Sequence, residues 1–379
     1  MEHCDGEIAP KLSNDGRSED RLSALPDDLL IHILVRLRNP AVAARTSVLS
    51  RRWRRLWTLL PELHFPPESD PQHIRLALTA HEAPALQRLD VCFSVASHAT
   101  PESVAAWLPI AARRLSGELV LVNVSGDETG ERGTLELPCF ENATKIVIEL
   151  LVYPGLAMPL SGIFARLTDL YLGHIMLRGP SMLGDALSSP RCPALQKLTL
   201  GGTGVLGNFT IHSESLLEMK LLNLLGLLQL IVTAPALKLL NVKSCFADRL
   251  GNNPRPPVAN ISAPQLVSLM WWDDYDPRFT QLGKMENLQC LSTCPFTVYG
   301  QDVHKSYNSY CTKLLRSFEL IHSLRFTLIY LLEDISHQQY LMEDIVRLPD
   351  ITFMSLDIIE NEHSFGARVH SMFSGCGLV

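Results

Sequence analysis

The sequence lacks the residue patterns that identify the common classes of enzyme. Its 379 residues contain no His-Glu-x-x-His zinc motif, no Gly-x-Ser-x-Gly nucleophile elbow and no set of kinase motifs. The glycine-rich stretch Gly201–Gly204 lacks the lysine and the following helix of a phosphate-binding loop, so we interpret it as a turn after a strand. Cys290 and Cys294 have no second pair of ligands at metal-binding spacing, which favours two buried thiols over half a zinc site. We therefore predict no catalytic residue, no metal and no cofactor.

Signals for secretion and for membrane insertion are also missing. Residues 1–19 are polar and contain no apolar segment of a signal peptide, which predicts a disordered tail over residues 1–20. The only membrane-like run, residues 216–232, is interrupted by charged side chains such as Glu218 and Lys220, which argues against a transmembrane helix. The nine cysteines are scattered and odd in number, which indicates reduced thiols. We expect an intracellular protein of the nucleus and/or cytoplasm with no membrane partner.

The charge is unevenly distributed along the chain. The net charge is −7, yet residues 21–60 contain eight basic and only two acidic residues. A basic segment beside an acidic body suggests separate partners for the two parts and does not indicate a nucleic-acid-binding protein.

Three short helices are predicted between residues 20 and 65. Pro26 fits the first turn of one helix, where its missing N–H is not needed. Asn39 and Pro40 end that helix and provide the N-cap and first residue of a second helix, which runs to about Leu49. Ser50 is a candidate N-cap for the third helix. Along this third helix, one apolar stripe contains Trp53, Leu56, Trp57 and Leu60.

The first of these helices is apolar on nearly all sides. One face is continuous, while Ile31 and Val35 lie on the far side. Such a helix should be buried nearly all round, which about 45 residues alone cannot achieve. The helices therefore either pack on the rest of the chain or form half of an interface. The continuous face, including its two flanking leucines, consists of Leu25, Pro26, Leu29, Leu30, Ile33, Leu34 and Leu37.

The stretches LPDDLLIHILVRL and TSVLSRRWRRLW closely resemble the F-box of the plant F-box/leucine-rich-repeat superfamily. The resemblance implies an F-box over residues 21–64 that docks to the Skp-type adaptor of an SCF-type cullin–RING ubiquitin ligase. It also implies that Trp53 ties the third helix into the module. The basic residues of this region could bind phosphate, but we favour the solvated, partner-facing side of the third helix for Arg45, Arg51, Arg52, Arg54 and Arg55. The adaptor-binding residues implied are the seven of the continuous face: Leu25, Pro26, Leu29, Leu30, Ile33, Leu34 and Leu37.

A leucine pattern recurs through the remaining residues. Segments of the form Pro-x-Leu-x-x-Leu-x-Leu, such as CPALQKLTL from Cys192 and APALKLLNV from Ala234, return at intervals of roughly 20–30 residues. In each, Leu-x-Leu places alternate side chains on the inner face of a short strand, and a unit this small buries its apolar side only by stacking on its neighbours. Ordinary amphipathic helices would need a longer 3.6-residue period. Two wide intervals are predicted to contain further units, at residues 114–122 and 287–291.

The predicted fold class is therefore α+β multidomain, with a small three-helix F-box followed by an irregular α/β leucine-rich-repeat solenoid over residues 65–379. The segments resemble the repeat region of the same superfamily, many members of which continue into a further C-terminal domain. The ending HSFGARVHSMFSGCGLV resembles the opening of another repeat, so we expect an early end without that domain.

One segment after a repeat strand favours recognition of a partner. Trp271 falls in a core position, so Trp272 should point outward, and with Tyr275 it is the best candidate for substrate binding. The neighbouring carboxylates, Asp273, Asp274 and Asp276, would favour a basic partner segment. A plain turn is an equally simple interpretation, and residues 251–257 are better explained as an ordinary loop than as a binding loop.

The predicted function is that of a non-catalytic substrate receptor: the F-box docks to the adaptor and the repeats bind a substrate protein for ubiquitination. One alternative is a receptor gated by a small hormone, for which Arg166, Arg178 and Lys197 are too widely spread in the sequence to define a pocket. The other is a binding scaffold outside any ligase.

Overall fold

The computed structural model describes residues 24–94, 99–123, 133–150, 155–177, 180–202, 204, 207–224, 226–246, 256–297, 301–329 and 349–359. The predicted tail, Arg178, most of the 251–257 loop and the predicted early end lie outside these residues. Within the described part of the chain, no helix is both long and apolar enough to span a membrane.

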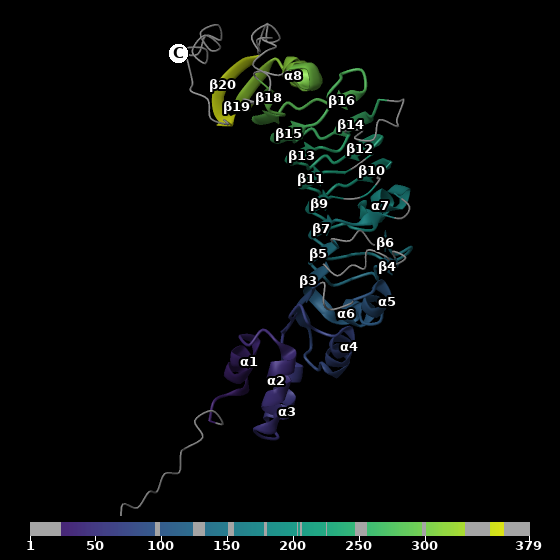
Figure 1. Ribbon diagram of the computed structural model, residues 1–379, viewed down its shortest axis with the longest axis vertical. Helices are drawn as coiled ribbons and strands as arrows, with labels where there is room; N and C mark the ends of the chain where they lie inside the picture. Colours follow the sequence, from purple (N-terminus) through teal and green to yellow (C-terminus); the bar gives the residue numbers. More distant parts are fainter. Residues whose placement is uncertain are drawn as a thin grey trace, which may run out of the picture.

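Three helical segments form a small module at one end of the molecule, as predicted (Figure 1). Asn39 caps the second segment, since its Oδ1 accepts the backbone N–H groups of Ala41 and Val42 at 2.9 and 3.3 Å. Two details of the prediction were wrong. Pro26 precedes the first helix as its N-cap residue, and the third helix begins after Arg52 without a side-chain cap from Ser50. The segments are α1 (Asp27–Val35), α2 (Pro40–Arg45) continued by η1 (Thr46–Val48), and α3 (Trp53–Leu56) continued by η2 (Trp57–Leu59).

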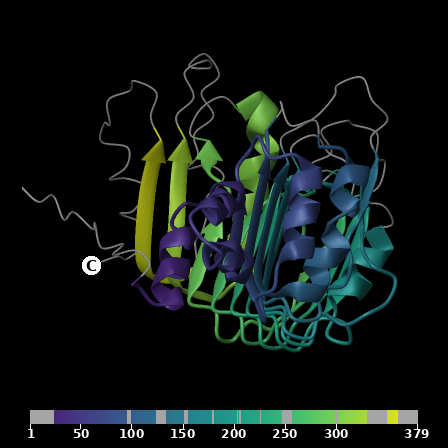
Figure 2. The ribbon, with the colours of Figure 1, turned by 90° about the horizontal axis from the view of Figure 1, so that it is seen from below.

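A thirteen-stranded parallel sheet runs through the rest of the described chain. Figure 1 shows this sheet on the concave side of an arc, and Figure 2, from below, shows its strands stacked behind one another and pointing the same way. The two strands predicted in the wide intervals are present as β3 and β17. In spatial order the strands are β1 (Glu62–Phe65), β2 (Leu86–Phe93), β3 (Leu115–Asn123), β5 (Lys145–Leu150), β7 (Asp169–Gly173), β9 (Lys197–Gly201), β11 (Glu218–Leu222), β13 (Leu239–Lys243), β15 (Ser268–Trp272), β17 (Cys290–Thr293), β19 (Leu320–Ile329) and β18 (Phe296–Thr297), with β20 (Asp350–Ile359) also paired to β19.

The convex side combines short strands with helices (Figure 1). In the middle of the solenoid this side is made of strands, because successive repeats there begin only 21 residues apart, at Leu195, Leu216 and Leu237, which leaves room for a second short strand but not for a long helix. The convex strands are β4 (Thr134–Glu136), β6 (Gly155–Ala157) and β8 (Met176–Leu177) in one sheet, and β10 (Asn208–His212), β12 (Gln229–Thr233), β14 (Val258–Ser262) and β16 (Thr280–Leu282) in another. The remaining helices are α4 (Pro71–Ala80), α5 (Pro101–Ala105), α6 (Leu108–Arg114), α7 (Pro180–Leu187) and α8 (Gln301–Arg316).

The leucines of the repeat pattern fill the space between the two sides. In the repeat from Leu237, this residue, Leu240 and Val242 are all fully buried, and the neighbouring repeats bury the equivalent side chains. Alternation along each strand sends every second residue into this core and leaves the others on the concave face. The solenoid predicted from the sequence is confirmed.

The helical module is joined to the solenoid by direct backbone contacts. The carbonyl oxygen of Thr58 accepts the N–H groups of Glu82 and Ala83 at 2.7 and 3.1 Å, and the buried His81 ring lies 2.8 Å through its Nε2 from the carbonyl oxygen of Leu60. The predicted boundary at residues 64–65 falls inside β1, which pairs with β2. The module is therefore packed directly against the first strands of the sheet and is not connected to them only through a linker.

Candidate functional site

The continuous apolar face predicted on α1 is divided by the fold into an inner and an outer part. Leu30 and Leu34 are fully buried in the core that also contains Trp53. Leu29, Ile33 and Leu37 are 50%, 43% and 41% exposed. Their spacing of four residues places these three side chains along one side of the helix and its last turn. We call Leu29, Ile33 and Leu37 the α1 stripe.

This division corrects the predicted binding residues. Leu30 and Leu34 have no surface from which to contact a partner, because the module uses them for its own core. Pro26 is exposed, and Leu25 is half-buried against that core. Ile31 and Val35, on the far side of α1, are also half-buried against it, so α1 packs on its own module with one side left open.

Arg52, the residue just before the third helix, fixes the start of α1. Arg52 Nε lies 2.5 Å from Asp27 Oδ1, and Arg52 Nη2 donates a 2.6 Å hydrogen bond to the carbonyl oxygen of Leu25. Arg52 therefore holds Leu25 and Pro26 beside α1, a role that its place in a run of arginines did not reveal. Arg54 and Arg55 are exposed, in agreement with the solvated side predicted for this run.

The module exposes further apolar side chains that the sequence did not indicate. Val42, Val48 and Leu49 are 39%, 88% and 60% exposed. With the α1 stripe, six of the fifteen large apolar side chains that are exposed in the described residues lie between positions 29 and 49. Concentrated exposed apolar surface of this kind marks an interaction site.

The N-terminal part of the concave face carries side chains of alternating charge. Parallel register places one acidic or basic residue opposite the next across seven adjacent strands, from β1 to β11. Glu118 is held by Arg88 Nη1 at 2.5 Å and by Lys145 Nζ at 2.7 Å, so this surface largely neutralises itself. We call the row the charge ladder: Glu62, Arg88, Glu118, Lys145, Asp169, Lys197 and Glu218.

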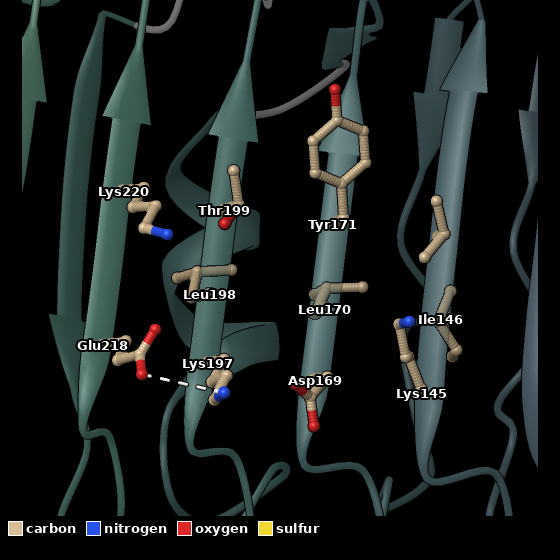
Figure 3. Close-up of a pocket in the computed structure, with 11 residues that line it drawn as sticks. Lys145, Ile146, Asp169, Leu170, Tyr171, Lys197, Leu198, Thr199, Glu218 and Lys220 are labelled. Atoms are coloured by element: carbon tan, nitrogen blue, oxygen red, sulfur yellow. Dashed lines mark ion pairs between the residues drawn. The ribbon is translucent and has the colours of Figure 1, made fainter.

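A shallow hollow of about 250 Å³ lies on the concave face across β5, β7, β9 and β11 (Figure 3). Tyr171 borders it, half-buried, and the pKa of its hydroxyl is raised by burial and by the charge of Glu149. Lys197 at its lower edge is engaged 3.6 Å from Glu218 (Figure 3). Arg166 is exposed in the turn before β7, so it does not join Lys197 in a convergent anion pocket.

Trp271 and Trp272 take opposite faces of β15, as alternation predicts. Trp271 is buried, and its Nε1 donates to the carbonyl oxygen of Asp274 at 3.2 Å. Trp272 is half-buried on the concave face, where its Nε1 donates to Ser292 Oγ at 3.0 Å. Lys243 Nζ lies 4.7 Å from the centre of the Trp272 ring, within the range of a cation–π contact. Trp272 is therefore a fixed aromatic surface on this face.

The structure does not bring Tyr275 to the open surface expected for substrate binding, because that side chain is only 3% exposed and packs edge-on to Trp271 with 6.4 Å between ring centres. Two of the three carboxylates predicted to form an acidic surface beside it are engaged within the fold. Asp273 is buried and accepts the backbone N–H groups of Cys245 and Phe246 in the preceding repeat. Asp276 Oδ2 lies 2.7 Å from Arg278 Nη2. The carboxylates of Asp273 and Asp276 therefore have partners within the chain, which the sequence did not indicate.

The buried Asp273 makes the stability of the solenoid depend on pH. Burial raises the pKa of its carboxyl from 3.8 to about 6, although its backbone N–H donors oppose this shift. The folded chain therefore holds the proton more tightly than the unfolded chain, and this stabilisation is lost as the pH rises from 4 to 6. A shift of this size corresponds to about 3 kcal/mol. We expect the free energy of unfolding of wild type, measured against Asp273→Asn by denaturant titration, to fall by that order across this interval; a constant difference between the two proteins would contradict this assignment.

The prediction that Cys290 and Cys294 are both buried holds for only one of them. Cys294 is buried as predicted, but Cys290 is exposed. No group of three or more His, Cys, Asp or Glu side chains with metal-binding geometry occurs among the residues for which the structure gives positions.

Comparison with known proteins gives a match for the helical module and another for the solenoid. The F-box domain model matches residues 22–65, and a model for the leucine-rich repeats of FBD-associated F-box protein At5g56370 matches residues 104–286. The Arabidopsis thaliana F-box/FBD/LRR-repeat protein At2g04230 is 29% identical over 279 residues, which covers 66% of this chain and 61% of that protein. The putative F-box/FBD/LRR-repeat protein At3g49030, also from Arabidopsis thaliana, is 31% identical over 241 residues, or 60% of this chain and 53% of that protein. The chain thus spans less than two thirds of the length of either relative.

Proposed function

This chain belongs to the plant F-box/leucine-rich-repeat family, and on that basis we propose that its helical module docks to the Skp-type adaptor of an SCF-type cullin–RING ubiquitin ligase. The observation that carries the proposal is the α1 stripe, three apolar side chains that the module leaves in water inside the segment matched as an F-box. Burying them in a complex would recover about 25 cal/mol for each Å² of apolar surface.

The second half of the proposal concerns the solenoid, whose concave face would bind a substrate protein. The chain itself would be non-catalytic, with ubiquitin transfer taking place on other subunits. Its contribution would be proximity, because two reactants held in one assembly meet at a high effective concentration. Such a receptor would act inside the cell, in the nucleus or the cytoplasm.

The joint between module and solenoid supports this role. The contacts of Thr58 and Leu60 with residues 81–83 tie the end of the third helix to the first repeats. Arg114 Nη1 also donates to the carbonyl oxygen of His81. A stiff joint of this kind would hold a bound substrate at a set distance and direction from the adaptor.

The two alternatives receive less support. A hormone-gated receptor needs a pocket with convergent polar groups, whereas the hollow beside Tyr171 is shallow and two of its three lysines, Lys145 and Lys197, pair with acids of the charge ladder. A scaffold outside any ligase would leave the α1 stripe without its adaptor, so the binding of an adaptor separates this alternative from the proposal.

The test is to mix the purified chain with a purified plant Skp-type adaptor and to separate the mixture by size-exclusion chromatography with light scattering. We expect a one-to-one complex at micromolar concentrations. Separate elution of a folded chain, checked by circular dichroism, would contradict the docking proposal and favour the scaffold.

A further inference from the structure

The concave face changes its electrostatic character between β9 and β13. In the charge ladder each cation is placed opposite an acid of the adjacent strand. In contrast, β13, β15, β17 and β19 contain no Asp or Glu at all. The next acids in the sheet are Asp350 and Asp357 on β20, beyond β19. The charge balance of the first strands therefore does not extend to the later ones.

Three cations that are not part of the charge ladder lie on the concave face from β11 onward. Lys220 and Lys243 are half-buried on β11 and β13, and Arg325 is exposed on β19. Lys220 faces Asn241, and Arg325 faces Ser292, so their neighbours across the strands are neutral. Among the described residues, no carboxylate lies within ion-pairing distance of any of the three cations. We call Lys220, Lys243 and Arg325 with Trp272 the basic platform.

An aromatic ring lies between these cations. Trp272 on β15 is held by Ser292 on one side and by the ammonium group of Lys243 on the other. Met270, half-buried two residues earlier on the same strand, also faces outward and adds apolar surface. The platform therefore combines positive charge at its two ends with an apolar centre.

The dimensions of the platform suit an extended segment. Lys220 and Arg325 are separated by four strand spacings, from β11 through β13, β15 and β17 to β19. At about 4.8 Å for each spacing this amounts to roughly 19 Å, which an extended chain covers with about six residues.

We propose that the basic platform binds an extended acidic segment of the substrate protein, with anionic side chains at both ends and an apolar side chain between them. This proposal rests on the proposed function, because it assigns a charge class to the substrate surface of the solenoid. The anions face Lys220 and Lys243 at one end and Arg325 at the other, and the apolar residue packs on Trp272 and Met270. A basic segment, which the aspartates after β15 suggested before their contacts were known, would meet three cations here and be repelled.

The segment's negative charge has two possible sources, the carboxylates of Asp and Glu or the phosphates of modified Ser and Thr. Both would pair with lysine and arginine, and phosphate would pair more strongly because it carries more charge and more acceptor oxygens.

The test uses three fluorescein-labelled ten-residue peptides with one apolar centre, ending in pairs of Asp/Glu, of phosphoserine or of Lys. Binding to the full chain is measured by fluorescence anisotropy at 50 and 300 mM NaCl. We expect the two anionic peptides to bind and the Lys peptide not to, with affinity falling as salt screens the charges. Comparison of the two anionic peptides distinguishes carboxylate from phosphate recognition.

The matched variants carry three charge reversals each. Lys220→Glu with Lys243→Glu and Arg325→Glu should weaken the anionic peptides by about tenfold or more. The control triple, Arg75→Glu with Arg166→Glu and Lys284→Glu, makes the same change in net charge at exposed positions off the platform and should bind as wild type does. Binding of neither anionic peptide at millimolar concentration, equal binding of the Lys peptide, or equal loss in both triples would overturn the proposal. Adaptor binding by the same proteins reports separately on docking, so failure of one proposal is distinguishable from failure of the other.

Discussion

Replacement of Trp53 by alanine is expected to unfold the helical module. The indole is only 5% exposed and belongs to the same buried core as Leu30, Leu34 and Leu56. Removing a buried tryptophan costs about 3–5 kcal/mol, and a domain this small has only a few kcal/mol of stability in total. The solenoid should remain folded, because its core is formed mainly by its own stacked repeats.

Hydrogen exchange measured by mass spectrometry separates these two parts of the chain. In Trp53→Ala, peptides from residues 27–59 should exchange nearly as fast as an unfolded chain, while peptides from β9 to β15 keep their protection. Trp57→Ala is the matched control. Trp57 lies with Trp53 on the apolar side of the third helix but is only half-buried, so its replacement should increase exchange less. Protection of residues 27–59 at the wild-type level in Trp53→Ala would show that this indole does not hold the module together.

The repeat architecture was predictable because each unit repeats the same physical requirement. The period-two alternation of Leu240 and Val242, or of Leu269 and Trp271, leaves only one face of a short strand suited to the core, and burial in the structure follows that pattern. The same rule placed Trp272 on the concave face before its contacts with Lys243 and Ser292 were known.

The details that could not be predicted depend on contacts between residues distant in sequence. Asp273 was assigned to a solvated acidic loop, but its carboxylate binds the backbone of Cys245 and Phe246, nearly thirty residues earlier. Nothing local in the sequence marks that pairing. Similarly, α1 is apolar on nearly all sides, so its periodicity does not tell which leucines face inward. Only the packing of the module shows that Leu30 is core and Leu29 is surface.

Because the surface side of α1 is the proposed docking surface, we expect the Ile33→Asp substitution to cause a large loss of adaptor binding. Ile33 is 43% exposed, so an aspartate at this position is hydrated in the free chain and the module should stay folded. In the proposed complex the carboxylate would be buried at an apolar contact without a partner. Burial of this kind costs several kcal/mol, which corresponds to about a hundredfold or greater loss of affinity.

The adaptor affinity of matched isoleucine variants, measured by isothermal titration calorimetry on the full chain, tests the docking proposal most directly. Ile163→Asp is the control, because Ile163 is 51% exposed but lies in the solenoid, far from α1 in the sequence. We expect wild type and Ile163→Asp to bind a Skp-type adaptor with the same dissociation constant, and Ile33→Asp to bind about a hundredfold or more weakly while its circular dichroism stays that of wild type. Equal affinity of Ile33→Asp and Ile163→Asp would contradict the assignment of the α1 stripe as the docking surface.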